Sequence, residues 1–196
     1  MVVKAGDVKT LREKTGGGVV ECKNALEEAN GNMAKAEEIL KKKGQARAEK
    51  VKDRVSKEGR VGSYVHTTGK IGVLVDLACE TDFVAKSDEF LALLKDLCLH
   101  VCACSPQYVS KANIPADVLE QETAKFAEEV KGKPPEIQKK ILDGKLTKTL
   151  FTQKCLLEQP FVKDDTLTIG ALIDAKVAKL RENIVVRRFQ RFEIGE

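Results

Sequence analysis

Apolar side chains in the first 44 residues recur at helical spacing and are interrupted by glycine. Asp7 is placed to cap a first helix, Gly16-Gly17-Gly18 separates it from a second, and Asn32 can cap a third that ends at Gly44. We therefore expect three short helices, over residues 8–14, 19–29 and 33–43. Helices this short bury little apolar surface, so their apolar positions should serve both a minimal core and a contact surface.

The pattern changes to strand spacing after residue 58. Residues 45–58 are polar and are expected to form a helical linker. Arg60–Thr68 then alternates, with Val61, Ser63, Val65 and Thr67 on one face. The sequence Thr67-Thr68-Gly69-Lys70 is typical of a turn, and Ile71–Cys79 is rich in β-branched residues. Together the two runs predict an antiparallel hairpin.

Most of the remaining chain shows helical spacing. Ser87 and Thr168 can cap the first and last of these helices, and Ser105-Pro106 ends the first. We expect helices over residues 88–104, 115–130, 134–142, 146–154 and 168–182, and a final strand over 184–193. If that strand pairs with the hairpin, the fold is α+β, a small antiparallel sheet with helices on one face. The predicted domains are a helical module (1–44), a basic linker (45–58) and an α+β core (59–196).

Composition places the 196-residue chain among globular proteins, with 42% hydrophobic and 33% charged residues. No apolar run approaches the length of a membrane span, and Met1 to Thr10 lacks the apolar core of a signal peptide. We therefore expect a cytoplasmic protein without membrane association. Residues 41–60 hold nine Lys/Arg and three Asp/Glu. This stretch could bind nucleic acid, but it lacks interleaved aromatic residues, so a solvated linker that steers an acidic partner is the alternative.

Motifs for catalysis are absent from the sequence. Cys98, Cys102 and Cys104 crowd around His100 and could suggest a metal site, but no second ligand pair follows and apolar residues interleave at helical spacing. Small buried hydrophobes on a helix are the alternative. Gly69-Lys70 lacks the preceding glycine and following hydroxyl residue of a phosphate-binding loop. We expect no enzyme activity, no metal and no cofactor.

One segment departs from its surroundings. An acidic residue and a bulky aromatic, Asp82 and Phe83, lie in the connection between the second strand and the helix at Ser87. They could be structural, with Asp82 as a helix cap and Phe83 as a plug of the core, or they could be functional. Spacing alone leaves both open.

Three stretches of the chain resemble the elongation factor Ts family. Residues 11–31 are similar to its N-terminal ubiquitin-associated-like module. Cys79-Glu-Thr-Asp-Phe-Val-Ala-Lys86 is similar to its core signature, and residues 156–165 and 182–193 resemble its later motifs. The three occur in the family order and span nearly the whole chain.

The resemblance implies a guanine-nucleotide exchange factor that binds elongation factor Tu in its GDP-bound and nucleotide-free forms. Thr81, Asp82, Phe83 and Val84 match the family's segment that disturbs the magnesium site of that partner and promotes GDP release. On this reading Phe83 wedges between partner side chains, and Asp82 holds the wedge by hydrogen bonds.

The resemblance also implies a second contact and an oligomeric state. The family's N-terminal module docks on the nucleotide-binding domain of the partner, which maps onto Arg12, Val19, Val20 and Lys23. Many relatives carry two methionines where this chain has Val19-Val20. Short members with a single core pair two chains, so a homodimer is expected. Two other functions stay open: a ubiquitin-associated-like adaptor that binds nucleic acid through the linker, and a thiol or metal enzyme built on the cysteines.

Overall fold

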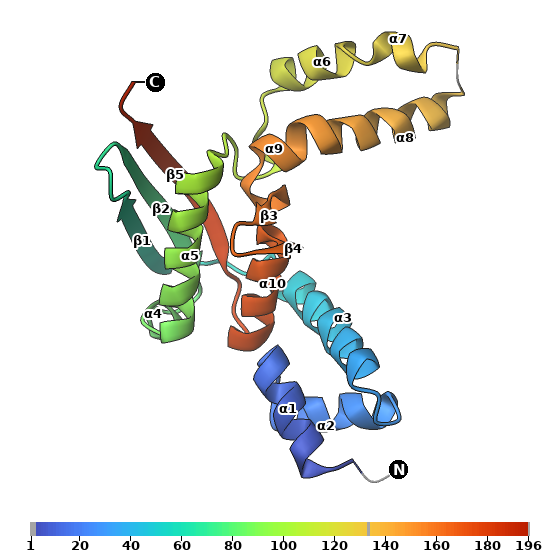
Figure 1. The fold of residues 1–196 in the computed structure, drawn as a ribbon, viewed down its shortest axis with the longest axis vertical. Helices are drawn as coiled ribbons and strands as arrows, with labels where there is room; N and C mark the ends of the chain where they lie inside the picture. The colour runs from blue at the N-terminus through green and yellow to red at the C-terminus, as the bar shows by residue number, and fades with distance from the viewer. Residues whose placement is uncertain (1–2, 133, 196) are drawn as a thin grey trace.

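The chain folds into an α+β structure, as predicted, with three N-terminal helices followed by a small antiparallel sheet packed against helices (Figure 1). The computed structural model describes residues 3–132 and 134–195. The N-terminal helices are α1 (Ala5–Thr15), α2 (Val19–Glu28) and α3 (Met33–Val51). The sheet strands are β1 (Glu58–Val65), β2 (Ile71–Cys79) and β5 (Val185–Glu193). The helices that follow β2 are α4 (Asp82–Ala85) and α5 (Asp88–Cys104).

The three N-terminal helices enclose a small core of their own. Its fully buried members are Leu11, Cys22, Ala25, Leu26 and Ala36. The prediction that Asp7 caps α1 is wrong, because the helix begins three residues earlier, after Lys4. Asp7 lies instead in the first turn, where a carboxylate is favourable near the positive end of the helix dipole. Asn32 caps α3 as predicted, its side chain accepting a hydrogen bond from the Lys35 amide.

Helix α3 does not end at Gly44, contrary to prediction, and continues to Val51. The reason lies in tertiary packing against α10 (Ile169–Leu180). A Cβ at position 44 would lie 3.2 Å from the Ala178 Cβ, so glycine lets the two helices approach closely. Ala48 and Val51, on the last turns of α3, enter the main core. Residues predicted as a separate linker therefore extend the N-terminal helix onto the core, and the chain becomes irregular only at residues 52–57.

The sheet has the order β1-β2-β5, and both pairs are antiparallel, as predicted. Val73, Val75 and Leu77 of β2 point into the core, where they meet α5 and α10. Phe90 and Leu97 of α5 are fully buried against them. Helix α5 has the predicted bounds, and Ser87 caps it by accepting a hydrogen bond from the Phe90 amide. Helix α10 ends two residues before the predicted residue 182, because Arg181 adopts a left-handed conformation.

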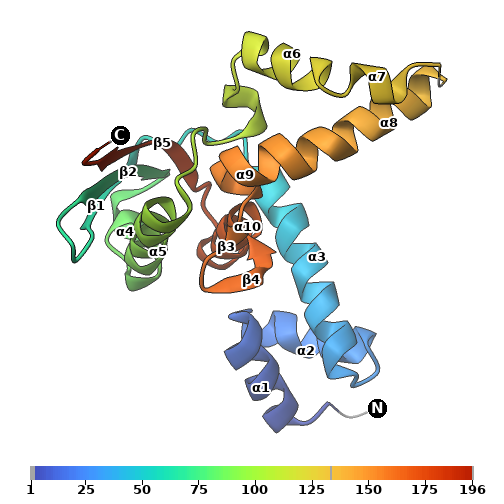
Figure 2. The same ribbon diagram turned by 45° about the horizontal axis from the view of Figure 1, so that its top comes forward.

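The part of the chain that follows α5 and precedes α10 in the sequence forms a helical arm, which projects from the core (Figures 1 and 2). It contains α6 (Ala116–Ala124), α7 (Ala127–Val130), α8 (Pro135–Leu146), a π-helical turn (Thr147–Phe151) and α9 (Thr152–Lys154). The single helix predicted over 115–130 is thus interrupted between Ala124 and Ala127. Helix α8 continues past Gly144, where it was predicted to end, because that glycine keeps helical geometry. Two short strands, β3 (Pro160–Phe161) and β4 (Asp164–Thr168), follow the arm and were not predicted.

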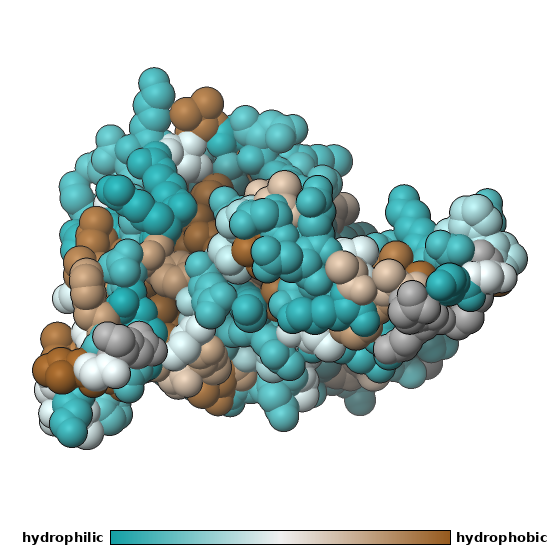
Figure 3. Space-filling model, turned by 90° about the horizontal axis from the view of Figure 1, so that it is seen from above, coloured by the Kyte–Doolittle hydropathy of each residue, from teal (hydrophilic) through white to brown (hydrophobic). Residues whose placement is uncertain are grey.

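No described helix covers the outer face of the sheet, which carries both apolar and polar side chains. Val65, Gly72 and Phe192 form one cross-strand row, and Val61, Asp76 and Arg188 form another, with Leu74 between the rows. Viewed from above, apolar atoms gather on the side of the molecule where Figure 1 draws the sheet (Figure 3). Among the described residues no helix is both long and apolar enough to cross a membrane.

Candidate functional site

The Thr81–Val84 segment forms the tight connection between β2 and α5. Thr81 is extended and caps α4, its side chain accepting a hydrogen bond from the Val84 amide at 3.4 Å. Val84 and Ala85 are buried in the main core, and the Ser87 hydroxyl donates to the Val84 carbonyl at 2.8 Å. One side of this single helical turn is therefore anchored in the core while the other faces outward.

Phe83 projects from the outward side and is 81% exposed. Both parts of the structural alternative are wrong, because Thr81 rather than Asp82 caps the turn and Phe83 does not plug the core. A single exposed apolar side chain is ordinary on a protein surface, so the exposure of Phe83 points to a partner contact only together with the anchored turn that carries it and the acidic side chain beside it. Such a ring on a well-anchored turn has the arrangement of a hot-spot side chain that awaits a pocket on a partner.

Asp82 lies beside Phe83 and is also exposed. Its carboxylate is 2.7 Å from the Lys86 Nζ one turn later. This hydrogen bond, with the attraction of the Lys86 charge, lowers the pKa of Asp82 below its usual value. Asp82 is therefore an anion at neutral pH, and it can accept hydrogen bonds from partner groups next to the ring of Phe83.

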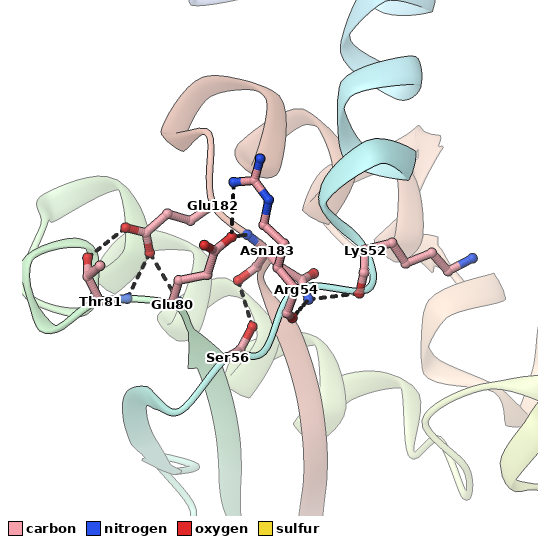
Figure 4. A network of polar contacts seen from close by, with 7 residues as sticks. All are labelled: Lys52, Arg54, Ser56, Glu80, Thr81, Glu182 and Asn183. Carbon is pink, nitrogen blue, oxygen red and sulfur yellow. Dashed lines mark hydrogen bonds and ion pairs between the residues drawn. The ribbon is translucent and has the colours of Figure 1, made fainter.

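The loop before Phe83 is held from the opposite side by the turn between α10 and β5. Glu182 and Asn183 of this turn form hydrogen bonds with Glu80 and Thr81 (Figure 4). Neither Glu182 nor Glu80 was predicted as a site residue from the sequence. Glu80 directly follows β2, and Glu182 follows α10. Two acidic residues just past the ends of core elements are the sequence feature that could have drawn attention to them.

The cysteine cluster lies within the core. Cys98 and Cys102 are buried on α5, and burial raises the pKa of Cys98 to about 11, so its thiol stays protonated at neutral pH. The buried His100 ring is 2.9 Å from the Gln159 side chain through Nε2 and accepts a hydrogen bond from the Val162 amide through Nδ1. Within residues 3–132 and 134–195 no group of three or more His, Cys, Asp or Glu side chains could hold a metal ion.

Comparison with known proteins gives the family. A family model described as elongation factor TS matches residues 7–196. The chain belongs to the elongation factor Ts family. Proteins named elongation factor Ts include one from an Anaeromyxobacter species, 52% identical over 99% of this chain and 89% of its own length. The protein from Fervidobacterium nodosum is 50% identical over the whole of both chains, and that from Thermotoga maritima is 51% identical over 96% and 94%. This family places the chain in translation elongation.

The N-terminal residues suggested by the family resemblance gather on one surface. Arg12, Val19 and Lys23 line a groove between α1 and α2 with a volume of about 360 Å³. Val20 lies outside the groove, and it and Val19 are both exposed. In this member of the elongation factor Ts family the groove is lined by the aliphatic side chains of Val3, Ala5, Val8 and Val19 and by the basic side chains of Lys9, Arg12 and Lys23.

A larger cleft of about 790 Å³ is lined by the end of α1, the start of α2, part of α3 and α10. It is bridged by Glu21 of α2, whose carboxylate is 2.5 Å from Arg47 of α3 and 3.6 Å from Arg181. The Arg47 hydrogen bond is the main reason that the pKa of Glu21 is lowered. The N-terminal helices and the Thr81–Val84 segment are thus both tied to the end of α10.

Proposed function

We propose that the chain is a guanine-nucleotide exchange factor that binds GDP-loaded elongation factor Tu and promotes GDP release so that GTP can bind. It acts without catalytic residues, metal or cofactor of its own, and it works in the cytoplasm without direct contact with nucleic acid. The observation that carries this proposal is the exposed Phe83 on an anchored turn, next to the anionic Asp82. Membership of the elongation factor Ts family supports it.

The proposed mechanism of GDP release depends on the negative charge of the nucleotide phosphates in the GTPase site. Magnesium neutralises the nucleotide phosphates, so displacing the groups that orient its ligands weakens GDP binding. Phe83 inserts its ring between partner side chains near that ion. Asp82 accepts hydrogen bonds that hold the ring in place, while Thr81 and Val84 keep the turn in shape.

The binding of the chain and the binding of GDP to elongation factor Tu are thermodynamically coupled. The chain binds nucleotide-free elongation factor Tu more tightly than the GDP-bound form. By thermodynamic necessity GDP then binds the complex more weakly by the same factor. The groove residues Arg12, Val19 and Lys23, with the neighbouring Val20, supply a second docking contact. The basic residues of α3 and the segment after it favour approach to an acidic partner surface.

The outer face of the sheet supports a homodimer. Val61, Val65 and Phe192 are each more than 60% exposed there, and Leu74 lies among them. An antiparallel sheet in a small domain leaves one face to water or to a partner, and the four exposed apolar side chains beside the Asp76–Arg188 ion pair favour the partner. We place a second copy of the chain on this face, sheet against sheet.

The test of the function is the release of fluorescent GDP from elongation factor Tu, followed by stopped flow with and without this chain. The proposal predicts a release rate constant that rises with chain concentration and saturates. A rate unchanged at every concentration would contradict the proposal. Retention of the chain on RNA in low salt, lost in high salt, would then favour the nucleic-acid adaptor.

A further inference from the structure

Arg181, Glu182 and Asn183 lie between α10 and β5. They contact α2, the loop before Phe83 and the segment after α3, respectively. Arg181 ends α10 in a left-handed conformation, with φ of 64°, and its amide donates to the Val177 carbonyl at 2.8 Å. This backbone bend turns Glu182 toward the loop before Phe83 and Asn183 toward the segment after α3 (Figure 4). A non-glycine residue in this conformation is uncommon, and here it directs the two side chains that follow.

Glu182 uses both carboxylate oxygens on the loop. Its Oε2 accepts the amide hydrogens of Glu80 and Thr81, at 3.1 Å and 3.0 Å. Its Oε1 accepts the Thr81 hydroxyl at 2.6 Å. Charge-assisted hydrogen bonds of this kind are stronger than neutral ones. One side chain thus satisfies two consecutive backbone donors and orients the hydroxyl that caps α4.

Asn183 closes the arrangement from the other side. Its amide donates to Glu80 Oε1 at 2.7 Å, and its side-chain nitrogen donates to the Lys52 and Arg54 carbonyls at 2.9 Å and 2.8 Å. The Ser56 hydroxyl donates to the Asn183 carbonyl at 3.1 Å. Asn183 is buried, so these bonds are shielded from water. The turn that carries Glu182 is therefore itself rigid.

We propose that Glu182 is a positioning residue for nucleotide exchange, which it serves by fixing the backbone from which Phe83 projects. This proposal rests on the exchange function proposed above. Buried Val84 and Ala85 hold the second half of α4, but its exposed first half has no apolar anchor and a single turn has little stability of its own, so the backbone there depends on the hydrogen bonds to Glu182. Without Glu182 the Glu80 and Thr81 amides would turn to water, and Thr81 would lose the acceptor of its hydroxyl. Phe83 would then sample several directions and would have to be ordered during docking.

The experiment compares Glu182→Ala, Glu182→Asp and Glu182→Gln with wild type in GDP release from elongation factor Tu at saturating chain. Glu182→Ala should lower the maximal release rate about ten- to a hundred-fold, since a misplacement of about 1 Å has effects of this order. Glu182→Asp keeps the charge but is one methylene too short to reach both amides, so it should also be slow. Glu182→Gln should stay within a few fold of wild type, because its oxygen can accept both amides and its nitrogen can donate to Thr81.

Glu89→Ala is the matched control. Glu89 also bridges α10 to another element, through Lys176 and Lys179, but it does not touch the Thr81–Val84 segment. It should release GDP at the wild-type maximal rate. Full activity of Glu182→Ala would overturn the positioning role, and so would a Glu182→Gln variant as slow as Glu182→Ala. An inactive wild type would instead contradict the proposed function.

Amide hydrogen exchange in the free chain separates positioning from unfolding. In Glu182→Ala the Glu80 and Thr81 amides should exchange faster by at least about ten-fold, while the amides of β2 residues such as Val75 keep their protection. In Glu182→Gln the two amides should stay protected. Unchanged protection of both amides in Glu182→Ala would overturn the proposal even if its GDP release were slow.

Discussion

At the scale of single residues, Phe83 is exposed because its neighbours Val84 and Ala85 occupy the buried side of the same helical turn. Its position beside Asp82, between a strand and a helix, identified it as unusual. The spacing of apolar residues did not show whether the ring is buried or exposed, because a side chain in a strand-to-helix connection can point either into the core or into solvent. Only the three-dimensional turn, with Val84 and Ala85 buried, places the ring outside. The contacts of Glu182 could not be predicted, since they join residues about a hundred positions apart.

Gly62 on β1 leads to a stability prediction. A Cβ at this position would lie 2.6 Å from Leu94 Cγ and 3.0 Å from Cys98 Sγ, on the buried face of α5. We expect Gly62→Ala to lower the free energy of unfolding by about 1–3 kcal/mol, the usual cost of overpacking a core. Urea denaturation of wild type and variant measures this difference.

Gly144 of α8 is the control, since its added Cβ would meet nothing within 4 Å. Gly144→Ala should be neutral or should stabilise the chain by up to about 1 kcal/mol, by lowering the entropy of the unfolded chain. Equal effects of the two substitutions would mean that the approach of β1 to α5 is looser than described.

At the scale of elements, local pattern predicted best the elements whose ends carry clear capping or turn residues. Helix α5 and strands β2 and β5 follow clear periodicities with capping or turn residues at their ends, and they were found within a residue or two. Gly44 failed as a helix stop because packing on Ala178 overrides its weak propensity. The hairpin of β3 and β4 was missed because its strands are too short for a visible alternation.

The ion pairs between α5 and α10 lead to a pH prediction. Hydrogen bonds from Lys176 and Lys179 lower the pKa of Glu89 to about 2, from 4.5 in the unfolded chain. The carboxylate therefore stabilises the fold above about pH 4.5, and this stability is lost as the pH falls toward 2. Because the Glu89 side chain is 36% exposed, solvent screening limits its contribution to about 0.5–1 kcal/mol.

Glu89→Gln should lower the free energy of unfolding by that amount at pH 7 and by almost nothing near pH 2. Urea titrations of wild type and variant at both pH values measure the two differences. A difference that persists at pH 2 would mean that Glu89 acts through packing rather than charge.

At the scale of the whole molecule, the sequence predicted the order of parts but not how they are joined. Helix α3 connects the N-terminal helices to α10 without a break, and the turn after α10 contacts both α2 and the loop before Phe83. The two proposed docking contacts are thus carried on one connected frame.

The proposed homodimer predicts that a charge on the outer sheet face separates the copies. Leu74→Asp should raise the dimer Kd at least about 100-fold, because an unpaired carboxylate in an apolar interface costs about 3 kcal/mol or more. Light scattering after size exclusion measures the mass. Ile137→Asp on α8 is the control, since Ile137 is 49% exposed and Leu74 46%. A wild-type chain that is monomeric at high micromolar concentration would contradict the dimer.

The central claim is that the Thr81–Val84 segment drives GDP release, and one measurement tests it most directly. Fluorescent GDP release from elongation factor Tu is compared for wild type, Phe83→Ala and Asp82→Ala, with Ile137→Ala as an exposed apolar control on the arm. Phe83→Ala should lower the release rate at least about 30-fold, the effect of losing a hot-spot aromatic worth about 2 kcal/mol. Asp82→Ala should lower it less, and Ile137→Ala should not change it. Release that stays fast in both Phe83→Ala and Asp82→Ala, with all variants folded, would contradict the account.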